Sequence, residues 1–87
     1  MKLINIKDSM MAKQIREVVE PTLRIILEEN TLCIIQKEKA IREFLTSIMA
    51  MSFISDFRIY AITDSIITVH IQPFFSYTPI VKVKVWK

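Results

Sequence analysis

Apolar residues recur along the chain at two different spacings, and the change of spacing divides it in two. Between residues 9 and 52 they recur every three or four positions, as on one face of a helix. Between residues 55 and 87 they recur at every second position, as on one face of a strand. Because a chain of 87 residues is the size of one domain, the sequence predicts a single domain with a helical part followed by a β part.

The helical part is predicted to hold two or three helices. Asp8 or Ser9 is expected to cap a helix that begins near Met10. Pro21 is expected to kink this helix or to begin another, because proline inside a helix costs about 3 kcal/mol. The clearest helix covers residues 37–51. Its apolar face is formed by Ile41, Phe44, Leu45, Ile48 and Met49.

The β part is predicted to hold three strands, near residues 57–62, 67–72 and 81–86. In each of them apolar side chains alternate with polar or aromatic ones, and Thr63 to Ser65 supply a tight turn. One apolar face per strand favours a small sheet of three to four mainly antiparallel strands with the helices packed on one face. The expected fold class is therefore α+β.

Composition adds one expectation and removes several classes of site. Apolar residues make up 52% of the chain, and so small a domain is expected to turn part of this surface toward a partner. Glycine is absent, which excludes the glycine-rich loops that hold phosphates and dinucleotides. The apolar stretches are too short for a membrane span, and no signal peptide is recognisable, so a soluble protein without membrane partners is expected.

Residues able to carry out catalysis are few and scattered. His70 is the only histidine and Cys33 the only cysteine, and neither has a neighbour at metal-ligand spacing. Glu28 and Glu29 are consecutive on a helix and therefore point in different directions. The sequence thus predicts no enzyme, no metal, no cofactor and no small-molecule substrate.

A nucleic-acid-binding face is a second interpretation. Arg58 and Tyr60 share a face of one predicted strand, and Lys82 and Lys84 share a face of the last strand beside Trp86. Lysines on a terminal strand also protect a sheet edge from pairing, and the net charge is only +3. The sequence therefore favours protein partners over nucleic acid, and an adaptor or inhibitor of one partner protein is a third interpretation.

Several stretches occur in an order that resembles a known family. They are Glu29–Thr31, the helical Ile41–Leu45 (Ile-Arg-Glu-Phe-Leu), Phe53–Ile59, the strand Ile66–Pro73 that ends in proline, and Ile80–Val85. This order resembles the C-terminal domain of contractile phage tail sheath proteins and covers about residues 25–87. The chain is far shorter than a sheath protein, and Met51-Ser52 stands where glycine is usual in the family.

The resemblance implies a small virion protein, such as a sheath-like or baseplate component, found in the virion or the host cytoplasm. In that family neighbouring subunits exchange strands, so copies of this chain or other assembly proteins become the expected partners. An extended N-terminal arm over residues 1–8 would then be the donated strand, through Leu3, Ile4 and Ile6. The accepting edge would be the last strand, formed by Ile80, Val81, Lys82, Val83, Lys84, Val85 and Trp86.

Overall fold

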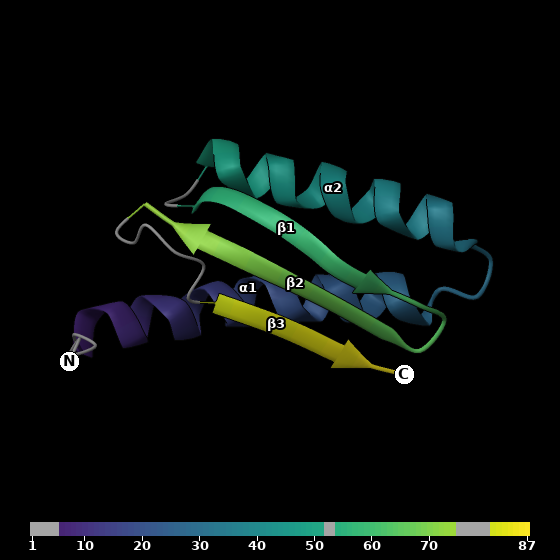
Figure 1. Ribbon diagram of the computed structural model, residues 1–87, viewed down its shortest axis with the longest axis horizontal. Helices are drawn as coiled ribbons and strands as arrows, with labels where there is room; N and C mark the ends of the chain where they lie inside the picture. Colours follow the sequence, from purple (N-terminus) through teal and green to yellow (C-terminus); the bar gives the residue numbers. More distant parts are fainter. Residues whose placement is uncertain (1–5, 52–53, 75–80) are drawn as a thin grey trace.

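A computed structural model of the chain describes residues 6–51, 54–74 and 81–87. Two helices come first and three strands follow (Figure 1). The helices are α1 (Ile6–Glu28) and α2 (Ile34–Met51), and the strands are β1 (Ile54–Ile62), β2 (Ile66–Pro73) and β3 (Val81–Trp86). The described part is therefore an α+β fold, as the sequence predicts.

The three strands form an antiparallel sheet in the order β1-β2-β3. The ladder between β2 and β3 pairs six residues of each strand without a shift, from Ile66 opposite Trp86 to Ile71 opposite Val81. The ladder between β1 and β2 is interrupted twice, between Ile54 and Asp56 and between Ile59 and Ala61. Such irregularities bend an edge strand, so the two edges of this sheet differ in shape.

Both helices pack on the same face of the sheet, α1 mainly against β3 and α2 mainly against β1. In Figure 1, α1 passes behind β2 and β3, whose other face is turned to the viewer. The core lies between the two layers. Its fully buried members include Val19, Leu23, Leu27, Ile41, Leu45, Ile67, Val69, Ile71, Val81, Val83 and Val85. In β2 and β3 the alternation therefore sorts side chains as the sequence predicts, with valine and isoleucine toward the helices. In β1 the register shift between Ile59 and Ala61 reverses it, so that Ile62, and not Ala61, lies opposite the buried Ile67 and packs against the core.

The ends of the helices are closed without glycine, and no described residue has a positive φ. The Nζ of Lys37, a residue only 3% exposed, donates a hydrogen bond of 2.9 Å to the carbonyl of Leu27 in the last turn of α1. At the start of α2, the side-chain oxygen of Gln36 accepts from the Cys33 backbone N–H at 2.9 Å, as in one half of a capping box. Side chains thus satisfy the backbone groups that a helix end leaves without partners.

Three expectations about the helices change. The helix α1 is continuous from Ile6 to Glu28 with Pro21 inside it, so of the two alternatives for Pro21, a kink or a second helix, the second helix is wrong. The helix α2 begins at Ile34, three residues before the expected start, because its capping contacts come from the preceding connection. The helix α1 begins at Ile6 and not near Met10, so Asp8 and Ser9 lie inside it and do not cap it, and residues 6–8 are not part of an extended arm. Within the described residues, neither helix is long and apolar enough to span a bilayer.

Candidate macromolecule-binding surfaces

The described residues contain no group of three or more histidine, cysteine or acidic side chains placed to hold a metal ion. Cys33 is exposed in the connection between the helices, while His70 lies in the middle of β2. Glu28 lies 3.8 Å from Arg24, and Glu29 accepts hydrogen bonds from both the N–H and the hydroxyl of Thr31. These hydrogen bonds hold the pKa of Glu29 below its ordinary value, so both glutamates serve the end of α1.

Four of the residues predicted for a nucleic-acid face share one face of the sheet. The register places Arg58 opposite His70 and His70 opposite Lys82, so these residues form one row across the three strands. Lys84 lies opposite Thr68 in the neighbouring row, and Tyr60 belongs to the same exposed set on β1. The side chains of Arg58, Lys82 and Lys84 are exposed, and no described element packs on this face. We call the surface formed by Arg58, Tyr60, His70, Lys82, Lys84 and Trp86 the open face.

The open face carries more positive than negative charge. Arg58, Lys82 and Lys84 form no ion pair among the described residues, and Asp56 is the acidic residue on this side of β1. The pKa of His70 is lowered, first by its partial burial and then by the positive charges of Lys82 and Arg58. The neighbouring cations therefore disfavour a further positive charge in the row and leave the surface attractive to anions.

Two aromatic rings lie among these charges. The ring of Tyr60 lies against the imidazole of His70, with 3.9 Å between the centroids and 32° between the planes. The Nζ of Lys84 lies 5.1 Å from the centre of the Trp86 ring, within the range of a cation–π contact. Tyr60 and Trp86 are each 56% exposed. Both rings are thus held in place from one side and accessible from the other.

The outer edge of β3 is the second candidate surface. The Lys87 N–H donates to the Ser65 carbonyl at 2.8 Å, which makes Ile66 and Trp86 a pair of the kind that is not directly hydrogen-bonded. Because the two kinds of pair alternate, the backbone N–H and C=O groups of Lys82, Lys84 and Trp86 all point away from β2. β3 therefore presents backbone hydrogen-bonding groups along its outer side.

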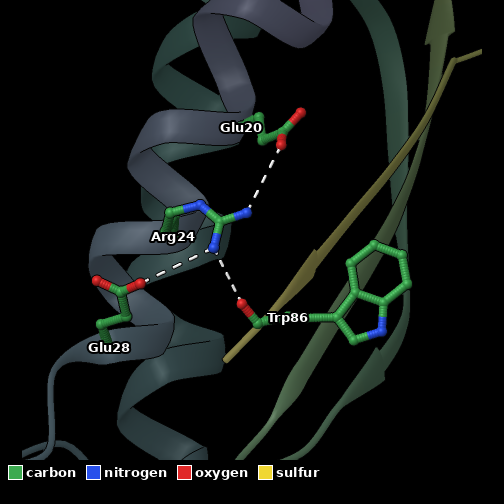
Figure 2. A network of polar contacts seen from close by, with 4 residues as sticks. All are labelled: Glu20, Arg24, Glu28 and Trp86. Carbon is green, nitrogen blue, oxygen red and sulfur yellow. Dashed lines mark hydrogen bonds and ion pairs between the residues drawn. The ribbon is translucent and has the colours of Figure 1, made fainter.

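Arg24 of α1 closes one end of this edge (Figure 2). Its Nη1 donates to the Trp86 carbonyl at 3.0 Å. The same guanidinium lies 3.8 Å from the carboxylates of Glu20 and Glu28, one turn away on either side. The carbonyl of Trp86 is thus already occupied, and the outward groups of Lys82 and Lys84 form the rest of the edge.

The structure divides the strand residues predicted as an accepting edge. Lys82, Lys84 and Trp86 are exposed, whereas Val81, Val83 and Val85 are buried against the helices and belong to the core. Of the predicted donor residues, Ile6 lies in α1, while Leu3 and Ile4 lie outside the described residues, as does Ile80 of the edge. The side chains available to a partner at β3 are therefore the two lysines and the tryptophan.

Sequence reasoning missed three features. Arg24 gave no sign of its contact with β3, because that contact joins residues 62 positions apart. His70 was assigned no role, although its alternation with Val69 and Ile71 placed it on the same side as the cations. The spacing of apolar residues also gave no sign that Met10, Val18 and Ile25 of α1 are exposed.

Comparison of the chain with protein-family models, with curated proteins and with solved structures finds no match.

Proposed function

We propose that this protein is a non-enzymatic assembly component that accepts an added strand along the outer edge of β3. The observation that carries the proposal is the row of outward-pointing backbone groups on Lys82 and Lys84. A strand laid against this edge gains main-chain hydrogen bonds, which supply affinity in strand addition. The partners would be copies of this chain or other assembly proteins.

The other edge of the sheet is less suited to pairing. β1 is interrupted by two register shifts, and the Asp56 side chain accepts a hydrogen bond from the Phe57 backbone N–H at 2.8 Å. Bulges of this kind protect natural sheet edges against pairing. β3 has an unbroken register over its six residues, which leaves it the more regular template for a partner.

Residues 1–5, with Leu3 and Ile4, supply the strand that we propose is donated to a neighbouring copy. Five extended residues span about 17 Å, close to the length of β3. Each copy would then give one strand and accept another. Such a head-to-tail contact produces rings or filaments. The resemblance to phage tail sheath proteins supports the same arrangement and favours a sheath-like or baseplate role in a virion.

The test compares Lys84→Pro with Lys84→Thr by light scattering over a concentration series. Proline removes the outward N–H of residue 84 but no hydrogen bond to β2, since that N–H points away from the sheet. Threonine removes the same charge and keeps the N–H. We expect wild type and Lys84→Thr to form rings or filaments and Lys84→Pro to have a lower mass at each concentration.

Removal of residues 1–5 tests the donor separately and is expected to give monomers. A wild-type protein that stays monomeric at every concentration contradicts self-assembly. A discrete heterodimer with one partner protein, without rings or filaments, would favour the adaptor interpretation instead.

A further inference from the structure

The open face offers a second kind of binding, which involves side chains and not the β3 backbone. We propose that this face binds single-stranded nucleic acid, with Arg58, Lys82 and Lys84 on the phosphates and Tyr60 and Trp86 beneath the bases. The proposal does not depend on the assembly described above.

The positions of the cations fit a chain of phosphates. Arg58 and Lys82 flank His70 in one row, two strand spacings or about 10 Å apart, and Lys84 lies two residues farther along β3 than Lys82. None of the three is neutralised by an ion pair among the described residues. A polyanion that crosses the sheet can therefore contact all three and release counterions, which is the main source of affinity in non-specific binding.

The exposed rings of Tyr60 and Trp86 favour single-stranded over double-stranded nucleic acid. Tyr60 and Trp86 are each 56% exposed, and each has a polar or charged partner that fixes it from one side. An exposed ring on a sheet gains energy by stacking against an unpaired base. In a duplex the faces of the bases are already stacked on one another, so only the charges of the open face would contribute.

The arrangement of the three strands also favours binding of a short single strand. The register keeps Arg58, His70 and Lys82 in one row on three adjacent strands, with no described helix above them. β3 extends over about 20 Å, so the site is expected to take only a few nucleotides. An acidic peptide would satisfy the cations but would leave the rings without planar partners.

The experiment measures binding of a labelled oligothymidine of about 12 nucleotides by fluorescence anisotropy, with a duplex of equal length beside it. Three phosphate contacts predict a slope of about −2 for log K against log salt, or about 20-fold weaker binding between about 50 and about 200 mM salt. Trp86 is the only tryptophan in the chain, so stacking beside it is expected to quench the intrinsic fluorescence of the protein.

Variants assign the binding to the open face. Lys82→Ala combined with Lys84→Ala is expected to bind more than about tenfold more weakly at low salt, with the slope reduced to about −0.7. The matched control, Lys13→Ala with Lys39→Ala, removes the same charge from exposed positions of the helices and is expected to bind as wild type. Tyr60→Leu is expected to bind the oligothymidine at least about fivefold more weakly than wild type. The slope of log K against log salt is expected to stay unchanged, because stacking does not depend on salt.

Four results would overturn the proposal, provided that circular dichroism shows folded variants. They are no binding at low salt, duplex affinity equal to or above that of the single strand, equal losses in the test and control pairs, and displacement of the oligonucleotide by poly-glutamate as readily as by unlabelled oligothymidine.

Discussion

At the scale of single residues, Lys37 shows how a glycine-free chain ends a helix. Helices commonly end with a glycine whose backbone closes the last turn, and this chain has none. The ammonium of Lys37 enters from α2 and donates to the Leu27 carbonyl, while its side chain is almost fully buried. One long side chain therefore ends α1 and links the two helices.

Replacing Lys37 by methionine tests this contact. Methionine keeps an unbranched apolar stem but leaves the buried Leu27 carbonyl without its partner, which is expected to lower the free energy of unfolding by about 1–3 kcal/mol. Urea unfolding measures the change, with Lys39→Met on the exposed side of α2 as the control. Equal effects of the two substitutions would show that the hydrogen bond contributes nothing.

His70 gives the stability of the fold a pH dependence. Its pKa in the folded chain lies below the value of 6.5 expected in the unfolded chain, because of partial burial and then the charges of Lys82 and Arg58. Below 6.5 the unfolded chain therefore binds more protons at this position, and the free energy of unfolding falls as the solution is acidified toward the folded pKa. Above about pH 7 the contribution of His70 is constant.

Denaturant unfolding at several values between about pH 7 and about pH 5 measures this dependence. We expect His70→Gln to lose less stability on acidification than wild type over this interval, since glutamine does not titrate. A steeper loss in His70→Gln than in wild type would mean that the sign of the shift is wrong.

At the scale of elements, Arg24 joins α1 to the edge of the sheet. The two helices share one layer, but only α1 donates a side-chain hydrogen bond to the described end of β3. Its ion pairs with Glu20 and Glu28 are long and largely exposed, so they contribute little on their own. The hydrogen bond to the Trp86 carbonyl holds the end of the strand, together with the hydrogen bonds of Lys87 to Ser65 and Asn30.

Substituting Arg24 by alanine is expected to cost about 1 kcal/mol of unfolding free energy through loss of this hydrogen bond. It also frees the Trp86 carbonyl for pairing, so self-association of the kind proposed above is expected to increase. Arg16→Ala is a suitable control, because Arg16 is exposed on the same helix and joins no ion pair among the described residues. A decrease in self-association for Arg24→Ala would contradict an accepting edge at β3.

At the scale of the whole molecule, the two helices cover one face of the sheet, and no other described element covers the opposite face or the regular edge at β3. The two surfaces use different atoms of the same strand, backbone groups at the edge and side chains on the open face. The two proposals can therefore fail separately. Lys84→Pro affects both surfaces, whereas Lys82→Ala with Lys84→Ala leaves the outward N–H groups of β3 in place.

The sequence alone determined the order of the elements and the buried side of β2 and β3, since both follow from the spacing of apolar residues. In β1 the register shift between Ile59 and Ala61 turned Ile62 and not Ala61 toward the core. Val81, Val83 and Val85 could be assigned to one face, and Lys82, Lys84 and Trp86 to the other, without coordinates. The tertiary structure decided how the strands pair, and therefore that Arg58, His70 and Lys82 form one row. It also decided the contacts of Arg24 and Lys37, because a hydrogen bond between residues far apart in the chain leaves no periodic trace in the sequence.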